Sequence, residues 1–147
     1  MSPDLPPADR RAIDPQRGQF AKQLSELPAD QPVTMLNLLR YREVADYSQA
    51  EELAPAQPIS GAEAYRIYGK AATPHLTKAG AEVIYHGDCG PTVIGPADEK
   101  WDSILLVRYP SPEAFRQMVT DPEYQSLSRH RTAAMADSRL IATTAES

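Results

Sequence analysis

The sequence lacks the features that mark several large classes of protein. It has one cysteine in 147 residues, Cys89, which excludes an intrachain disulfide and fits a reducing compartment, so we expect a cytoplasmic protein. No apolar run is long enough to cross a bilayer, and the start, Met1–Pro7, has neither region of a signal peptide. Lys and Arg form no stripe and the formal net charge is -5, so we expect neither nucleic acid nor a membrane as partner.

The motifs of cofactor-dependent chemistry are also missing. The chain has no glycine-rich phosphate loop, no serine nucleophile elbow and no paired cysteines. His86, Asp88 and Cys89 are close in sequence, but a single cluster in a Gly/Pro-rich turn is a poor zinc signature. Three histidines are also too few, in their exposed contexts, to predict a haem ligand. We therefore expect no metal and no other cofactor.

The composition that remains is that of an ordinary globular domain. Hydrophobic residues make up 41% of the chain and charged residues 24%, which is enough for one self-sufficient core. Residues 1–13 are rich in proline and predict a loose arm, followed by a helix with Asp14 as its N-cap and Pro28 as its end. We divide the chain into an arm and helix, 1–30, and a main domain, 31–147.

The stretch Val33–Tyr41 organises the main domain. Both alternating faces of this predicted strand are largely apolar, with one amide, Asn37, in the middle. Such a strand is expected to be covered on both sides. A chain of this size has helices for only one cover, so we expect the second cover to come from another molecule.

The other predicted elements follow a recognisable order. They are a helix opened by the capping box Ser60–Glu63 and ended by Gly80, strands 81–86 and 101–109, a short extended piece 92–95, helices opened by Ser111-Pro112 and Asp121-Pro122, and a strand 138–144. Pro74 predicts a kink in the first of these helices. The long segment 42–59 predicts either a surface excursion or a lid over a pocket.

This order predicts an α+β fold. Strand, helix, strand, strand, helix, strand is the ferredoxin-like βαββαβ arrangement, a four-stranded antiparallel sheet with both helices on one face. The apolar residues on the other face would leave a large exposed patch on a monomer. We therefore expect a homodimer that packs sheet against sheet.

Short fragments along the main domain resemble one bacterial family. They are Met35-Leu-Asn-Leu38, Gly61-x-x-Ala-Tyr65, Val93-Ile-Gly-Pro96, Trp101-Asp102, Tyr109-Pro-Ser111, Phe115, Asp121-Pro-x-Tyr124, His130-Arg-x-Ala133 and Asp137-Ser-Arg-Leu140. Their joint order, over about residues 32–143, resembles the family called domain of unknown function 1330, in the dimeric α+β barrel superfamily. The family has no agreed reaction. The resemblance implies a site in the barrel cavity of each subunit, and superfamily relatives include cofactor-free monooxygenases, lactone isomerases, haem enzymes and ligand-binding proteins.

Two histidines are the candidate catalytic residues. His86 ends the second predicted strand and His130 lies in the last predicted helix; histidine exchanges protons near neutral pH and suits general acid–base work. The alternatives are structural. His86 would bond to backbone or solvent at a strand end, and His130 would cap nearby carbonyls.

Six further residues are candidates for binding a substrate: Asn37, Tyr41, Tyr68, Trp101, Arg131 and Arg139. If Leu36 and Leu38 face the helices, Asn37 faces the barrel interior, where a buried amide needs a hydrogen-bond partner. Either arginine would bind a carboxylate through its paired donors. The alternatives are a structural bond for Asn37, packing for Tyr68, a sheet edge for Trp101 and an ion pair with Asp121 or Glu123 for Arg131.

These residues predict a small-molecule protein. The first hypothesis is a cofactor-independent isomerase or monooxygenase in which a histidine base removes a proton beside a carbonyl. The alternative is a non-catalytic homodimer, which either binds a small ligand in the same cavity or is purely structural.

Overall fold

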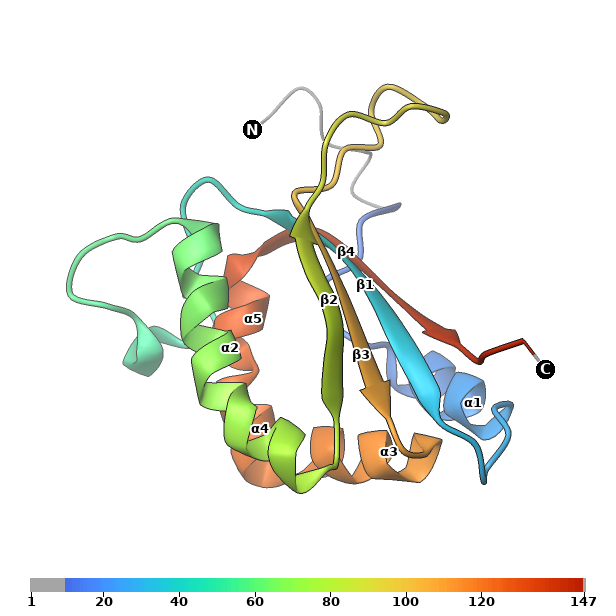
Figure 1. The fold of residues 1–147 in the computed structure, drawn as a ribbon. Helices are drawn as coiled ribbons and strands as arrows, with labels where there is room; N and C mark the ends of the chain where they lie inside the picture. The colour runs from blue at the N-terminus through green and yellow to red at the C-terminus, as the bar shows by residue number, and fades with distance from the viewer. Residues whose placement is uncertain (1–9, 147) are drawn as a thin grey trace.

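A four-stranded antiparallel sheet is the centre of the fold. The computed structural model describes residues 10–146. The strands are β1 (Val33–Tyr41), β2 (Glu82–Asp88), β3 (Ser103–Tyr109) and β4 (Met135–Thr143), and they lie in the order β2-β3-β1-β4 (Figure 1). β1 is a central strand of the sheet, between β3 and β4.

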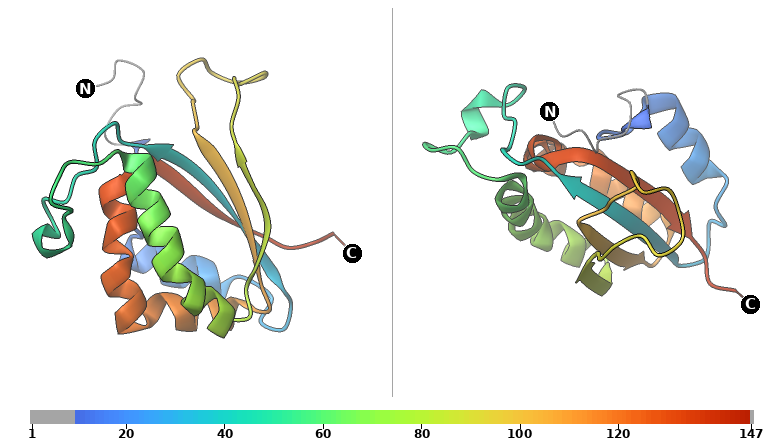
Figure 2. Two further views of the ribbon diagram at one scale, coloured as in Figure 1. Left: turned by 60° about the vertical axis from the view of Figure 1, so that its left-hand side comes forward. Right: turned by 90° about the horizontal axis from the view of Figure 1, so that it is seen from above.

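The helices lie on one face of this sheet, as the left view in Figure 2 shows. They are α1 (Arg17–Ser25), α2 (Gly61–Lys78), α3 (Pro112–Thr120), α4 (Pro122–Leu127) and α5 (Arg129–Ala134), with a single 3-10 turn at Glu51–Leu53 before α2. The predicted ferredoxin-like α+β fold is therefore confirmed. The extra N-terminal helix, α1, packs on the same core, where Phe20 contacts Phe115 at 5.9 Å between ring centroids.

Three predicted helix starts are confirmed by their capping bonds. The Ser60 hydroxyl accepts from the Glu63 N–H at 3.1 Å, and the Ser111 hydroxyl accepts from the Ala114 N–H at 3.1 Å. The Asp121 carboxylate accepts from the Glu123 N–H at 2.8 Å at the start of α4. Such caps satisfy backbone donors that have no partner inside the helix.

Other predicted boundaries are wrong. Asp14 does not cap α1, which starts at Arg17 after Gln16, because the Asp14 carboxylate accepts from the Thr132 hydroxyl of α5 at 2.7 Å. The predicted extended piece 92–95 is not a strand, and residues 93–95 form bends. β4 begins at Met135, earlier than predicted, since Met135 pairs with Tyr41 beyond a register shift that leaves Ala136 of β4 without a partner in β1.

The buried residues of the hydrophobic core form two clusters under the helices, and the partly buried Tyr68 of α2 packs against both. One contains Met35 of β1 and is closed by α1, α3 and α4; the other contains Leu39 and is closed by α5 and the segment 42–59. Met35 is 2% exposed and Leu39 0% exposed. Asn37 lies between them on the same side of β1, so the core is interrupted at this residue.

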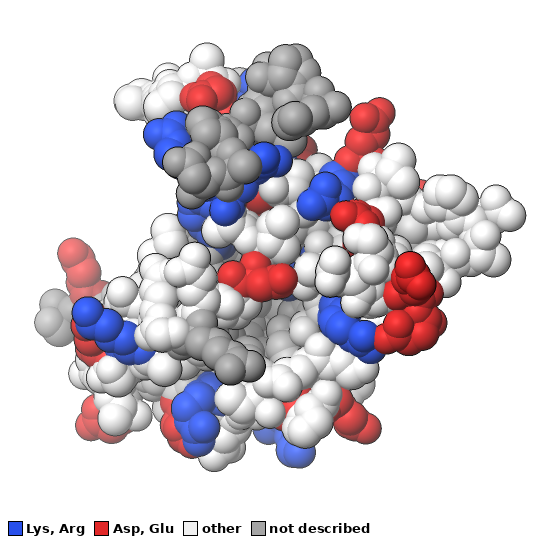
Figure 3. Space-filling model, turned by 180° about the vertical axis from the view of Figure 1, so that it is seen from behind, with Lys and Arg blue, Asp and Glu red and all other residues white. Residues whose placement is uncertain are grey.

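The opposite face of the sheet has no cover within residues 10–146. The apolar side chains on it are Leu36, Leu38, Ile104, Leu106 and Ile141, all partly or largely exposed. Elsewhere the surface carries mixed charge: Figure 3 shows Lys and Arg side chains interspersed with Asp and Glu on the face seen from behind. The described chain has no helix that is long and apolar enough to span a membrane.

Candidate functional site

Opposite α2, the helix side of the sheet is partly exposed between the two clusters of the core. Asn37 and Leu105 are cross-strand partners at the centre of the sheet, and both side chains point towards the helices. Their neighbours Met35, Leu39 and Val107 are buried, but Asn37 and Leu105 are partly exposed. The helix layer therefore leaves the sheet uncovered at this point.

The edge strand β2 forms one wall of the opening. His86 pairs with Leu105 and Val83 pairs with Val107, so both side chains also point to the helix side. Val83 is nevertheless 52% exposed, and His86 is exposed as well. Because Val107 beside it is only 3% exposed, the helices cover β3 but do not reach β2.

The other wall is the sheet-facing side of α2. Tyr68 and Gly69 are partly buried there, and Gly69 lies one turn from the buried Tyr65 and from the buried Ala72. A Cβ atom built on Gly69 would meet no atom within 4 Å, so space remains beside the helix. We name this partly exposed region the central cleft and define it by the residues around it, Asn37, Tyr68, Gly69, His86 and Leu105.

Asn37 faces the helices, whereas the prediction for it assumed that Leu36 and Leu38 face them. Leu36 and Leu38 face the uncovered side of the sheet, and Asn37 shares the helix side with Met35 and Leu39. The Asn37 Nδ2 donates to the Leu105 carbonyl at 3.2 Å and, at a longer 3.4 Å, to that of Met35. None of residues 10–146 donates to its Oδ1, which leaves one acceptor at the cleft floor.

Tyrosine side chains lie at both ends of the central cleft. Tyr41 donates to the Ser103 Oγ at 3.1 Å and its ring lies 5.5 Å from that of Tyr65, while the Tyr68 and Tyr124 hydroxyls are 2.6 Å apart. Burial raises the pKa of Tyr65 and Tyr124, and it also raises the pKa of Tyr41. These three phenols are therefore neutral hydrogen-bonding groups at physiological pH.

His130 belongs to a different part of the molecule. Its Nδ1 lies 2.8 Å from the Tyr47 hydroxyl, and burial together with the nearby Arg129 lowers its pKa. Tyr47 lies in the segment 42–59, which is also held by the bond from the Asp46 N–H to the Ala133 carbonyl at 2.8 Å. Figure 2 shows α2 between α5, the helix that contains His130, and β2, the strand that contains His86.

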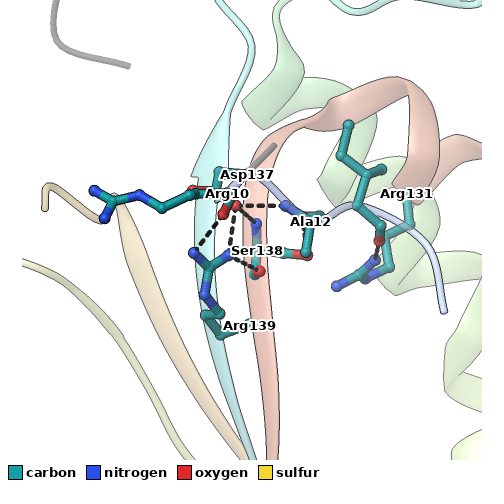
Figure 4. Close-up of polar contacts among 7 residues, drawn as sticks. Arg10, Ala12, Arg131, Asp137, Ser138 and Arg139 are labelled. Carbon is teal, nitrogen blue, oxygen red and sulfur yellow. Dashed lines mark hydrogen bonds and ion pairs between the residues drawn. The ribbon is translucent and has the colours of Figure 1, made fainter. Parts of the chain in front are cut away.

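Arg131 and Arg139 hold the N-terminal segment onto the domain (Figure 4). Arg139 donates to the Arg10 carbonyl and Arg131 donates to the Ile13 carbonyl, each at 2.8 Å. The Ala12 N–H donates to Asp137 at 2.9 Å, and the Ser138 hydroxyl donates to the Ala12 carbonyl at 2.8 Å. Residues 10–13 are therefore bound along β4 rather than loose; residues 1–9 of the predicted arm lie outside the described residues.

Trp101 lies in another hollow of the surface. The Arg139 guanidinium lies 5.3 Å from the centroid of its ring, and both residues line a cavity of about 210 Å³ together with Arg10 and Asp137. A cavity of about 190 Å³ lies at the far end of α2, beside His75 and Met118 of α3. Neither cavity includes residues of the central cleft.

The structure thus divides the eight candidate residues among several places. It places Asn37 and His86 on either side of Leu105, with Tyr68 on the facing helix α2 and Tyr41 at the end of β1, and it places the other four elsewhere. Sequence reasoning missed Leu105 and Gly69 as lining residues. A glycine in the middle of a helix is unfavourable, and that signal at Gly69 was available.

The described chain offers no ready metal site. No group of three or more His, Cys, Asp or Glu side chains among residues 10–146 is placed to hold an ion. The arrangement at the central cleft is instead suited to hydrogen bonding and proton transfer, since it combines an amide, a phenol and an imidazole beside apolar side chains.

Comparison with known proteins identifies the family. The family model of a domain of unknown function, DUF1330, matches residues 56–144. The crystal structure of a protein of unknown function from Rhodopseudomonas palustris is 37% identical, with a TM-score of 0.82, over 93% of this chain and 98% of that chain. A methylated form of that protein gives the same identity and TM-score, over 93% and 96% of the two chains.

More distant matches add little. A protein described as dimeric, of unknown function and with a ferredoxin-like fold, from Bacteroides fragilis, is 13% identical with a TM-score of 0.47, over 80% of this chain and 99% of that chain. We infer nothing about assembly from so distant a match. Among curated proteins, none matches this chain. The family match and the Rhodopseudomonas relative confirm the resemblance found in the sequence: the chain belongs to the family of proteins with the domain of unknown function DUF1330.

Proposed function

We propose that this protein is a homodimer that binds a small organic molecule in the central cleft of each subunit and uses His86 as a cofactor-independent acid–base group. The observation that carries this proposal is the interruption of the core at Asn37. A polar, partly exposed residue there separates two well-packed clusters on a central strand. A pocket with apolar walls and a few convergent polar groups is the usual form of a ligand site.

The polar groups suit proton transfer beside a carbonyl. In such a reaction the Tyr68 hydroxyl accepts from the Tyr124 hydroxyl and donates its own proton in a hydrogen bond to the carbonyl oxygen. The His86 imidazole removes the neighbouring proton. The Asn37 Oδ1 accepts from a hydroxyl or enol of the same ligand. This assignment corresponds to isomerase or monooxygenase chemistry without a cofactor.

The remaining candidates have weaker roles in this proposal. Tyr41 lies beyond the upper end of the central cleft, and its hydroxyl is already bonded to Ser103. His130, Trp101, Arg131 and Arg139 bind other parts of the chain, so the proposal assigns them no contact with the ligand. The guanidinium groups of Arg131 and Arg139 donate to backbone carbonyls, so they are not available to a carboxylate ligand.

A second candidate function is ligand binding without chemistry. The observation that favours it is at His86: none of the described residues makes a hydrogen bond with its ring. Catalytic bases are commonly oriented by a further polar group, and an exposed histidine without one is less well prepared. A binder would use the same cleft, so an activity measurement separates the two functions.

The test uses the two histidines as a matched pair. We expect the wild-type protein to exchange the acidic C–H protons of at least one compound in a panel of cyclic ketones and unsaturated lactones, followed in D2O by proton NMR. His86→Gln should lower that rate by roughly 100-fold or more, since general acid–base catalysis contributes this much. His130→Gln should leave it nearly unchanged. The opposite pattern would refute the role of His86, and binding of a panel compound without exchange would favour the non-catalytic function.

The homodimer is proposed from the uncovered face of the sheet. Its centre is apolar, with Leu36, Leu38, Ile104 and Leu106 of β1 and β3 all partly exposed. Large exposed apolar patches are unusual in monomers, and a two-fold copy of the same face is the simplest cover.

A charge on this face should break the dimer. We expect a dimeric mass for the wild-type protein in native mass spectrometry and a monomeric mass for Leu38→Asp, because Leu38 lies at the centre of the patch beside Ile104. Ile67→Asp is the control: Ile67 is 40% exposed on α2, away from the sheet, and should remain dimeric. A monomeric wild-type protein at micromolar concentration would rule the dimer out.

A further inference from the structure

The edge strand β2, which contains His86, has little cover within its own subunit. Among residues 10–146 it pairs only with β3, and all of its residues except Gly87 are exposed. A register shift between Val83 and Tyr85 leaves Ile84 without a partner in β3. A strand with one neighbour and no packing on either face belongs to the part of a protein that opens most readily.

One side chain of β2 nevertheless lies in a defined position. A Cβ atom added to Gly87 would lie 2.5 Å from the Tyr85 hydroxyl oxygen and 2.7 and 2.8 Å from the ring carbons Cε1 and Cζ. The Tyr85 ring therefore lies directly on the bare backbone of Gly87. It covers the one residue of β2 that is not exposed.

This ring lies on the uncovered face of the sheet. Tyr85 pairs with Leu106 and Gly87 pairs with Ile104, and both partners belong to the apolar side chains of that face. Tyr85 is 55% exposed, and its hydroxyl makes no hydrogen bond with any of residues 10–146. Large exposed aromatic side chains that are already held in one conformation are typical anchors of protein interfaces.

We infer that Tyr85 anchors the homodimer and that the second copy, by packing on Tyr85, fixes β2 and with it His86. This inference rests on the proposed homodimer and on the proposed role of His86. Successive side chains of a strand point to opposite faces, so Tyr85 faces the second copy while His86, the next residue, faces the central cleft. The cleft therefore lacks a firmly held wall until the dimer forms.

The charges on this face favour a second copy of the same chain as the occupant. Glu82 lies opposite Arg108 in the pairing of β2 with β3, and Arg139 forms an ion pair with Asp137. A two-fold interface brings a surface against itself, so a surface of one sign would repel its own copy. Opposite charges side by side around an apolar centre avoid that repulsion.

The dissociation constant of the dimer, measured by analytical ultracentrifugation, tests the anchor. Tyr85→Ala should raise it by about 30-fold or more, as is typical for an anchoring aromatic residue. Gly87→Ala should raise it by about three- to ten-fold, because the three atoms nearest to the added Cβ all belong to Tyr85 and the ring must move. Val83→Ala is the matched control: Val83 is 52% exposed on the same strand but faces the helix side, so the constant should not change.

Hydrogen exchange, followed by mass spectrometry, tests the effect on β2. In the wild-type protein the amides of residues 82–88 should exchange about ten-fold more slowly above the dissociation constant than in a dilute, monomeric sample. Tyr85→Ala at the same two concentrations should show the faster exchange in both. The Tm of each dilute variant should match that of the dilute wild-type protein, which shows that the variant is folded.

The outcomes separate this inference from the proposed function. A dimer that Leu38→Asp breaks and Tyr85→Ala leaves intact would overturn the inference and keep the proposed homodimer. Exchange in β2 that does not depend on the dimer would overturn the link to His86. A wild-type protein that is monomeric at micromolar concentration would overturn both the inference and the homodimer.

Discussion

Replacement of Gly61 by alanine is expected to destabilise the protein by about 3 kcal/mol or more. Gly61 is the first residue of α2, and its N–H donates to the Arg42 carbonyl at 2.9 Å. The Arg42 N–H in turn donates to the Ala134 carbonyl at 2.8 Å, which joins the end of β1, α2 and α5. An added methyl group would push against the backbone at Arg42 and at Ala134, and the nearest atoms there belong to no flexible side chain that could yield.

Urea unfolding of Gly61→Ala and of the wild-type protein measures this effect. Gly18→Ala is the matched control, because an added Cβ there meets nothing within 4 Å. It should stabilise α1 by about 0.5–1 kcal/mol, as expected for glycine to alanine in a helix. Equal stability of the two variants would mean that the junction at Arg42 and Ala134 adjusts without cost.

Replacement of Asp137 by alanine is expected to cost about 3 kcal/mol, at the lower end of the range for breaking a buried ion pair. Asp137 is 1% exposed and accepts from Arg139 at 2.7 Å, from the Ser138 N–H at 2.8 Å and from the Ala12 N–H at 2.9 Å. The lower end applies because the Arg139 side chain is 34% exposed, so water can partly solvate the remaining charge.

Asp137→Asn distinguishes the charge from the hydrogen bonds. Asparagine keeps one acceptor oxygen. The loss of stability in urea unfolding should therefore be clearly smaller for Asp137→Asn than for Asp137→Ala. Hydrogen exchange should also show faster exchange of the Ala12 amide in Asp137→Ala, because its acceptor is removed. Unchanged protection of Ala12 would mean that the N-terminal segment is held mainly by Arg131, Ser138 and Arg139.

Local sequence signals predicted most of the fold, for reasons that act over a few residues. Ser60, Ser111 and Asp121 each supply an oxygen to the first turn of the helix that follows, and this chemistry is the same in any tertiary context. The apolar faces of β1 predicted a central strand because such a pattern requires cover on both sides. Asp14 had the same local signal as the three caps and failed, because Thr132 of α5 binds its carboxylate instead.

The candidate site was predictable only in part. Alternation along β1 placed Asn37 with Met35 and Leu39, but which side of the strand the helices cover depends on how the whole sheet packs. His86 and Tyr68 were chosen by residue type, and the pairing of β2 with β3 and the position of α2 bring them together. Arg131 and Arg139 were equally plausible by type, yet their guanidinium groups bind carbonyls of the N-terminal segment, a contact between residues more than 100 positions apart.

The sequence by itself determined the order of the elements, the helix caps, the apolar core positions and the membership in the DUF1330 family. Each of these depends on composition, period or short motifs, which fix local conformation and burial. Only the tertiary structure decided that the core divides at Asn37, that α2 leaves β2 uncovered and that Gly69 faces open space. A cleft is a region that side chains do not fill, and whether they fill it depends on the distances between elements, which no local pattern records.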